Sequence, residues 1–169
     1  MILYHGSNMI ISAIDLNLCR PYKDFGQGFY CTDIKEQAEL MAKRVARIYG
    51  GTPCVNEFDF NEHIYKDKEL NIQLFDGPTE GWANFVLNNR DRKFSDTKSL
   101  DCNKDNKYDL VVGPVANDDL ALLFRTFTRG LIDINILVKE MKYKKLSNQY
   151  SFHTENSLKY LKVIRGQLA

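Results

Sequence analysis

The sequence lacks the features that mark several large classes of protein. Its apolar runs all fall short of the about 20 residues that a membrane-spanning helix needs, which excludes an integral membrane protein of that kind. Its 23 lysines and arginines nearly balance its 22 acidic residues, for a net charge of +1. This balance argues against a protein that binds through a basic field over its whole surface, although a local basic patch is compatible with a neutral total.

Cysteine is sparse and scattered. The chain has four, at Cys19, Cys31, Cys54 and Cys102, with no C-x-x-C pair and no histidine at the spacing of a metal ligand. We therefore expect structural thiols rather than a zinc site or a disulfide framework, and no metal cofactor. The amino terminus has neither a basic segment nor an apolar segment of signal-peptide length. Together these features predict a protein of the reducing cytoplasm.

What the chain does contain is the composition of a folded domain. Hydrophobic residues make up 44% of its 169 residues, with 10 Phe and 9 Tyr. This excludes intrinsic disorder and predicts one globular domain over residues 1–169. Strand and helix patterns do not follow the strict alternation of a doubly wound sheet, so the predicted class is α+β. The expected strands are 2–5, 29–32, 54–60, 108–115 and 150–153, and the expected helices are 34–49, 79–89, 117–127 and 132–141.

Two segments carry further local predictions. Asp33 is expected to cap the start of the most regular helix, with Glu36 three residues later at capping-box spacing. The pair Gly50-Gly51 is expected to end that helix. Residues 91–107, which have many charges and few large apolar side chains, are expected to form an exposed linker or excursion.

A first candidate site is the sequence His5-Gly6-Ser7 at the end of the first expected strand. A glycine there lets a planar ligand approach the main chain, because no Cβ blocks it. The exposed N–H and C=O can then hydrogen-bond both ends of a carboxamide. A lone histidine at a strand end also fits an ordinary structural or surface role, so this pattern is informative only together with a second one.

The second pattern is Phe25-Gly26-Gln27-Gly28-Phe29-Tyr30, which leads into a strand and then a helix. Its G-x-G pair is not a dinucleotide-binding fingerprint, because that fingerprint follows a strand and opens a helix. The two glycines are instead expected to let a loop turn tightly into a strand that presents Tyr30 to a cleft. The alternative is that Tyr30 is a packing aromatic.

Taken together, the two patterns resemble the first two signatures of the ADP-ribosyltransferases of the diphtheria toxin and poly(ADP-ribose) polymerase type, which carry a His–Tyr–Glu triad on three strands. A third piece follows in the right order, Asn148-Gln149-Tyr150-Ser151-Phe152-His153, and after it the run from Leu158 to Val163. The resemblance touches both ends of the chain and leaves about residues 50–145 uncovered. More closely, the chain is similar to small stand-alone bacterial proteins of unassigned function that share these motifs and the run from Gly113 to Asp119. The resemblance implies a split, twisted, mainly antiparallel sheet with flanking helices.

The resemblance also implies a role for each matching residue in binding NAD as co-substrate. The main chain of Gly6 would bind the nicotinamide carboxamide, with the Ser7 hydroxyl as a helper. His5 would hydrogen-bond ribose hydroxyls, and Tyr30 would stack on the nicotinamide ring. Arg20, before the glycine-containing loop, is the expected diphosphate contact because a guanidinium suits phosphate geometry. An exposed arginine without that role is the alternative.

Two positions depart from the family pattern. Met41 stands near the family's second stacking aromatic, and a thioether covers a ring without sandwiching it as an aromatic side chain does. Gln149 stands where the triad has its glutamate, so it can accept a hydrogen bond but carries no charge and removes no proton. Electrostatic contributions of this kind are worth about two to three powers of ten in rate. This argues against chain elongation on ribose hydroxyls and is compatible with a single transfer to an acceptor that is already nucleophilic, or with a base from elsewhere. The nearest candidates for such a base in sequence are Asp118, Asp119 and Glu155.

These residues predict an enzyme with His5, Tyr30 and Gln149 as its catalytic residues. It would transfer one ADP-ribose from NAD to a macromolecular acceptor, protein or nucleic acid, and release nicotinamide. By analogy with the family, it would be a bacterial toxin or effector controlled by a cognate antitoxin or another regulatory protein. The alternatives are a pseudoenzyme that binds NAD or ADP-ribose without turnover, a transferase acting on a nucleic-acid base, and a plain interaction module.

We predict from the sequence that His5→Ala abolishes nicotinamide release from NAD in a lysate, because the ribose loses its imidazole contact. Gln149→Glu is expected to retain the release or to increase bare hydrolysis. The measurement is nicotinamide release by the native protein and both variants. Equal rates for the native protein and His5→Ala would remove the catalytic assignment.

Overall fold

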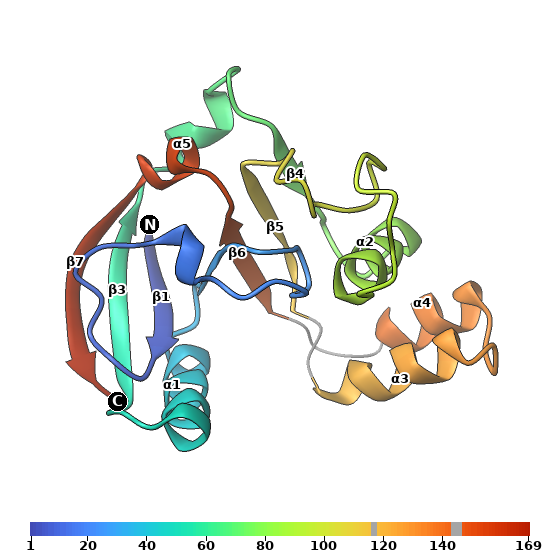
Figure 1. Cartoon of the computed structure of the whole chain (residues 1–169), viewed down its shortest axis with the longest axis horizontal. Coiled ribbons are helices and arrows are strands. Elements are labelled where there is room, and N and C mark those ends of the chain that lie inside the picture. The colour runs from blue at the N-terminus through green and yellow to red at the C-terminus, as the bar shows by residue number, and fades with distance from the viewer. Residues whose placement is uncertain (116–117, 143–146) are drawn as a thin grey trace.

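A computed structural model describes residues 1–115, 118–142 and 147–169 (Figure 1). The strands in these residues are β1 Ile2–Ser7, β2 Phe29–Thr32, β3 Cys54–Phe60, β4 Ile72–Leu74, β5 Leu110–Pro114, β6 Asn148–Phe152 and β7 Leu161–Leu168. They form one seven-stranded sheet in the order β4-β5-β6-β2-β1-β3-β7. Neighbours are antiparallel except β4 and β5, which are parallel. The sheet and its flanking helices confirm the predicted α+β class.

The helices lie in two groups. Their bounds in the described segments are η1 Leu16–Leu18, α1 Lys35–Tyr49, η2 Glu62–Lys66, α2 Glu80–Arg90, α3 Asp118–Thr128, α4 Ile134–Lys142 and α5 Glu155–Leu158. In Figure 1, α1 lies beside β1, whereas α2, α3 and α4 gather beyond β5. Within the segments that the structure describes, no helix combines the length and the apolar character needed to cross a membrane.

Two hydrophobic clusters pack on opposite faces of the sheet, because successive residues of a strand point to opposite sides. In β5, Leu110 and Val112 join the first cluster, whereas Val111 joins the second. In β6, Tyr150 and Phe152 also join the first cluster. The second cluster packs the sheet against α2, α3 and α4. The buried side chains that these helices contribute to it are Trp82, Ala83, Phe85, Val86, Leu120, Phe124, Leu137 and Met141.

The sheet is split near its middle. Strand β1 is paired with β3 along its whole length, from Ile2 to Ser7, but with β2 at the single pair Tyr4↔Thr32. Beyond this pair β1 and β2 separate, although they are neighbours in the sheet. A split of this kind agrees with the architecture that the family resemblance implies.

The start of α1 differs from the prediction. The N-cap is Ile34, not Asp33, and the Ile34 side chain makes no capping hydrogen bond. The Thr32 hydroxyl accepts from the Ile34 N–H over 3.2 Å, so the end of β2 is hydrogen-bonded to the residue that begins the helix. The predicted end is confirmed: Gly50 and Gly51 follow the helix with φ of +75° and +90°.

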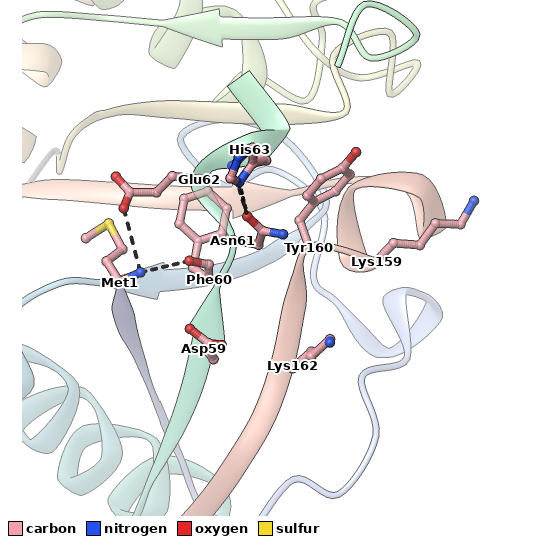
Figure 2. A pocket seen from close by; sticks show the side chains of 9 residues that line it. All are labelled: Met1, Asp59, Phe60, Asn61, Glu62, His63, Lys159, Tyr160 and Lys162. Atoms are coloured by element: carbon pink, nitrogen blue, oxygen red, sulfur yellow. Dashed lines mark hydrogen bonds and ion pairs between the residues drawn. The ribbon is translucent and has the colours of Figure 1, made fainter. Parts of the chain in front are cut away.

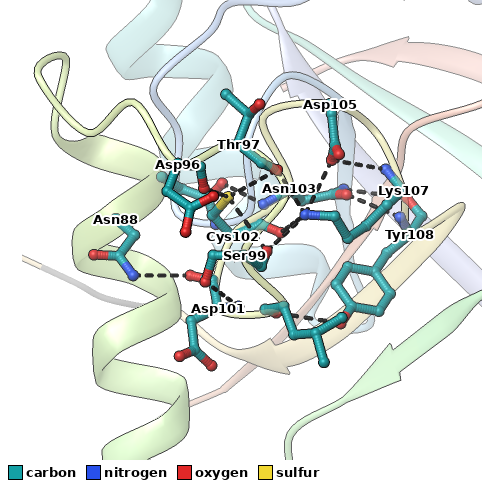
Figure 3. A network of polar contacts seen from close by, with 12 residues as sticks. Asn88, Asp96, Thr97, Ser99, Asp101, Cys102, Asn103, Asp105, Lys107 and Tyr108 are labelled. Carbon is teal, nitrogen blue, oxygen red and sulfur yellow. Dashed lines mark hydrogen bonds and ion pairs between the residues drawn. The ribbon is translucent and has the colours of Figure 1, made fainter.

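The segment 91–107 is more ordered than its charges suggest (Figure 3). It folds around the Cys102 side chain, which is fully buried. The Lys107 ammonium donates to the Thr97 and Ser99 carbonyl oxygens over 2.7 and 2.6 Å. Most of the segment is exposed, as predicted for a linker or excursion. Cys102 and Asn103 are buried in its interior, where Lys107 satisfies main-chain carbonyls that the fold withdraws from water.

This segment also supports the loop before β2. Gly26 has a φ of +95°, and a Cβ there would lie 2.8 Å from the Asn103 carbonyl oxygen. The Asn103 N–H donates in turn to Asn89 Oδ1, on α2, over 2.8 Å. The first glycine of the G-x-G pair is thus required both by its backbone conformation and by a carbonyl that α2 holds in place.

We predict that Gly26→Ala destabilises the fold by about 2 kcal/mol or more, because it adds a steric contact to the strain of a positive φ. Gly130→Ala is the matched control, since its φ of +71° is also positive but no atom lies within 4 Å of the point that a Cβ there would occupy. The control is expected to lose about 1 kcal/mol. Urea denaturation measures both losses. Equal losses would mean that the Asn103 carbonyl yields to the new methyl group.

Candidate active site

We call the three segments that begin at His5, Phe25 and Asn148 the first, second and third motifs. The structure brings the second and third motifs together on one face of the sheet. Tyr30 in β2 pairs with Ser151 in β6, and Thr32 pairs with Gln149. Opposed residues of antiparallel strands point to the same face, and we call this face the site face. The intervening residues of both strands belong to the first hydrophobic cluster on the other face. In Figure 1 strand β6 lies between α1 on one side and α2 to α4 on the other.

His5 lies where β1 and β2 separate. Its Nδ1 donates to the Tyr30 carbonyl oxygen over 2.6 Å. A ring nitrogen that faces a carbonyl carries the proton, so the neutral imidazole keeps Nε2 as an acceptor. Burial lowers the pKa of His5 from its ordinary value, which favours this neutral form.

The His5 ring does not point to the site face. It stacks on Phe29, with ring centroids 4.3 Å apart, and Phe29 belongs to the first hydrophobic cluster. The side chains of His5 and Gln149 therefore lie on opposite faces of the sheet, with β2 between their strands. A ligand that contacts both side chains would have to extend through the split between β1 and β2, because β2 and β6 are paired.

The main chain of Gly6 faces this split. Met1 and Phe60 exchange both of their main-chain hydrogen bonds over 2.8 Å. In an antiparallel pair such bonds alternate, so every second residue from Met1 points its N–H and C=O to β3. The N–H and C=O of Gly6 point the other way, beyond the last pair with β2. This is the orientation that binding a carboxamide through Gly6 requires.

The missing Cβ of Gly6 has a different role from the predicted one. A Cβ at this position would collide with the Ala38 carbonyl oxygen and approach the Ala42 nitrogen to 2.7 Å. Both atoms belong to α1, whose buried side chains are these two alanines. Glycine here makes room for helix packing on the site face, and the helix is thereby held close to the split.

Tyr30 uses its hydroxyl to hold the preceding loop. The hydroxyl donates to the Gly26 carbonyl oxygen over 2.7 Å and accepts from the Phe25 N–H over 3.0 Å. Burial, with the nearby Asp24 carboxylate, raises the pKa of Tyr30 far above its ordinary value. The half-buried ring remains as the part of Tyr30 that can contact a ligand.

Met41 lies on α1 toward the site face. Gln37, one turn before it, accepts from the Thr32 hydroxyl over 3.1 Å and donates to the Ser147 hydroxyl. Residues four apart share a face of a helix, so Met41 is directed to the same side as Gln37. Its side chain is 49% exposed, which leaves it available to cover a bound ring as the sequence predicts.

Ser7 and Arg20 are less directly connected to these groups. Ser7 is buried at the end of β1, opposite Cys54 of β3. Arg20 is exposed and its guanidinium lies 3.9 Å from the ring centre of Tyr49, with a hydrogen bond to the Tyr49 hydroxyl. That contact holds Arg20 at the carboxyl end of α1. The predicted diphosphate contact of Arg20 and the helper role of Ser7 stay predictions.

A carboxylate that sequence reasoning missed lies against Gln149. The Gln149 Nε2 donates to Asp24 Oδ2 over 2.9 Å. The other carboxylate oxygen, Oδ1, accepts from Arg90 Nε and Nη2 over 2.9 and 2.6 Å. Asp24 and Gln149 are each only 9% exposed. The available signal was an acidic residue immediately before the motif that starts at Phe25.

The three acids proposed as a base have different outcomes. Glu155 begins α5, beyond the opposite end of β6 from Gln149. The three strand steps from Gln149 to Phe152 span about 10 Å, and Glu155 lies beyond them, so the structure does not place it beside Gln149. The side chains of Asp118 and Asp119 lie outside the part of the chain that the structure describes.

A second histidine lies under the glycine-containing loop. The His153 Nδ1 donates to the Gln27 carbonyl oxygen over 2.8 Å, and its Nε2 is buried without a partner among the described residues. The ring lies edge-on to Tyr30 and is 3% exposed. Burial lowers the pKa of His153 to about 4. The loop that contains Gly26 and Gly28 is therefore bonded, at the Gln27 carbonyl, to a neutral imidazole.

A surface pocket of about 380 Å³ lies away from these groups (Figure 2). Its lining includes Met1, whose ammonium group donates to the Phe60 carbonyl oxygen, and Tyr160. Along β1, Met1 is about 17 Å from Gly6. The lining includes none of the predicted site residues, which are His5, Gly6, Ser7, Arg20, Tyr30, Met41 and Gln149. The described residues contain no group of three or more side chains suited to hold a metal ion.

Comparison with known proteins identifies the family of the chain. Residues 1–163 match the family described as "Protein of unknown function (DUF3990)", so the chain belongs to that family. No curated protein matches the chain. No solved structure matches it either.

We predict that the free energy of unfolding falls as the pH decreases from about 6.5 toward about 4. The pKa of His153 is lower in the folded chain than its unfolded value of 6.5, so in this range the unfolded chain binds the additional proton and stability is lost. In His153→Asn the amide can still donate to the Gln27 carbonyl, and we expect a shallower dependence. Urea denaturation between pH 4.5 and 7 measures it. Identical slopes for both proteins would contradict the assignment to His153.

Proposed function

We propose that this chain is an NAD-dependent mono-ADP-ribosyltransferase that modifies a macromolecular acceptor, a protein or a nucleic acid, and releases nicotinamide. The observation that carries the proposal is the split between β1 and β2, which the His5 imidazole bridges to the Tyr30 carbonyl and which the main chain of Gly6 faces. These groups come from the first two motifs, and Gln149 of the third motif is on the next strand, β6.

In this proposal the first motif binds the nicotinamide. The Gly6 N–H donates to the carboxamide oxygen, and the Gly6 carbonyl accepts from the carboxamide nitrogen. Such a pair of bonds needs a strand residue whose main chain is not already bonded to a neighbouring strand. The Tyr30 ring stacks on the nicotinamide, and Met41 covers it from α1.

The reaction breaks the C–N bond between nicotinamide and ribose. Nicotinamide leaves with the electron pair of that bond, and the ribose develops oxocarbenium character, as in glycoside hydrolysis. A nucleophilic atom of the acceptor then bonds to the ribose C1 and loses its proton to solvent. His5 Nε2, as an acceptor, holds a ribose hydroxyl and so fixes the sugar for this displacement.

Gln149 limits which acceptors are suitable. Its carbonyl oxygen can accept from a ribose hydroxyl, but the amide cannot remove a proton. This favours one transfer to an atom that is already nucleophilic over chain elongation on ribose hydroxyls. The same uncharged amide supports a second candidate function, a pseudoenzyme that binds NAD or ADP-ribose without turnover.

The biological setting follows from the family resemblance alone. It is a bacterial toxin or effector of the cytoplasm, held inactive by a cognate antitoxin or another regulatory protein. NAD is the only small molecule that the proposal requires, as co-substrate, and no step needs a metal ion.

We predict that His5→Ala lowers nicotinamide release at least 100-fold, because the ribose is no longer held in register. His63→Ala is the matched control, since His63 is exposed on η2 and lines the pocket of Figure 2 instead of the split. The control is expected to retain the native rate. Release is measured with NAD in a cell lysate. A native rate for His5→Ala would contradict the proposal.

The acceptor class is decided by labelled NAD. We expect that incubation with a lysate transfers label to macromolecules, and that only one of the two treatments, nuclease or protease, releases it. Thermal denaturation with NAD separates the second candidate function, because a pseudoenzyme is stabilised by NAD but releases no nicotinamide with any acceptor. Absence of both stabilisation and release would leave the interaction module.

A further inference from the structure

The side-chain amide of Gln149 is hydrogen-bonded through its nitrogen. Its Nε2 donates to Asp24 Oδ2 over 2.9 Å and lies 3.4 Å from the Pro114 carbonyl oxygen. Two acceptors on the same side fix the orientation of an amide, because the reverse orientation would face oxygen with oxygen. The Gln149 Oε1 is therefore directed away from Asp24 and is the atom that remains for a ligand.

Asp24 is itself held firmly enough to impose that orientation. Arg90 of α2 binds its Oδ1 through two nitrogens. The residues that follow Asp24 are held by the Tyr30 hydroxyl, at the Phe25 N–H and the Gly26 carbonyl. Both ends of the contact, Asp24 and Gln149, are buried. Because both side chains are fixed and buried, their contact has one defined geometry, whereas side chains at the surface can adopt several.

We propose that Asp24 is a positioning residue that orients Gln149 and requires an amide at position 149. The proposal rests on the proposed function. Gln149 Oε1 accepts the hydrogen bond of a ribose hydroxyl, and Asp24 keeps that oxygen turned toward the ribose. In the ADP-ribosyltransferase pattern a single glutamate has this role. In the proposal the Gln149 amide contacts the ribose and the Asp24 carboxylate orients that amide.

In this proposal the same contact accounts for a glutamine at the position where the ADP-ribosyltransferase pattern has glutamate. A carboxylate at position 149 would lie within hydrogen-bond distance of Asp24, and two such groups repel unless one takes up a proton. Among the described residues, the charged and titratable groups shown against Asp24 include the Arg90 guanidinium on α2 and the Tyr30 phenol on β2. Arg90 offsets one carboxylate, not two.

This changes the expectation for Gln149→Glu that the sequence alone suggests. With Asp24 in place, the variant is expected to lose stability at pH 8 relative to pH 5, because one of the two carboxylates takes up a proton only at lower pH. Its nicotinamide release at neutral pH is expected to fall about 100-fold, since the acceptor oxygen is displaced.

The test is the exchange of the two groups. In Asp24→Asn/Gln149→Glu the new amide can accept from Arg90 with its oxygen and donate to the new carboxylate with its nitrogen. We expect this double variant to recover the stability at pH 8 and nicotinamide release to within about tenfold of native. Asp24→Asn alone is expected to fold but to lose about 100-fold in release, because Gln149 reverses to meet the new donor and turns Nε2 toward the ribose.

Glu57→Gln is the matched control. Glu57 is also a buried carboxylate bound to an arginine, with Arg165 Nε at 2.8 Å, but it lies on β3 outside the site. The control is expected to lower stability and to leave release and NAD affinity unchanged, which separates positioning from a general loss of structure.

The measurements are thermal denaturation at pH 5 and pH 8 without NAD, the dissociation constant of NAD, and nicotinamide release. Native release by Asp24→Asn, or no recovery in the double variant, would overturn the proposal while the proposed function stands. A native protein that neither binds NAD nor releases nicotinamide would overturn the proposed function, and the ribose contact with it. The stability measurements then still report whether Asp24 and Gln149 are in contact.

Discussion

The separation of β1 from β2 is the constraint on which the rest of the site depends. Adjacent strands normally satisfy each other's main chain, yet here the ladder stops after Tyr4↔Thr32. The His5 side chain replaces the next bond by donating to the Tyr30 carbonyl. The polar groups of Gly6 are left facing the split, and a buried polar group of this kind calls for a partner. A planar carboxamide is a partner of the right chemistry.

The loop before β2 connects this split to the rest of the site. Tyr30 holds it from one side through its hydroxyl, and Asn103 supports it from the other side at Gly26. The loop in turn carries Asp24 to Gln149, on the strand next to β2. One short segment therefore positions groups of all three motifs. The charged excursion that supplies Asn103 has a structural role in this arrangement and is not a linker.

Much of the fold follows from local pattern. The strand at Phe29–Thr32 and the strand at Cys54–Phe60 have the predicted bounds, because β-branched and aromatic residues lie between clear breakers. Helix α1 ends at Gly50 and Gly51 because these glycines are themselves local breakers. Strand β4, at Ile72–Leu74, escaped prediction because three residues carry too little pattern and are fixed only by pairing with β5. The cap at Ile34 was missed because an isoleucine has no side-chain acceptor and so gives no capping signal in the sequence.

The sequence by itself determined the order and type of the main elements and the chemical identity of three motifs, since these depend on spacing and on side-chain chemistry. Only the tertiary structure decided that segments from opposite ends of the chain pair as β2 and β6, that the Gly6 main chain faces a split, and that Asp24 meets Gln149. Contacts between distant segments depend on how strands pair and helices pack. A chain of residues read in one dimension does not contain the distance between Asp24 and Gln149, and the chemistry of the site depends on that distance.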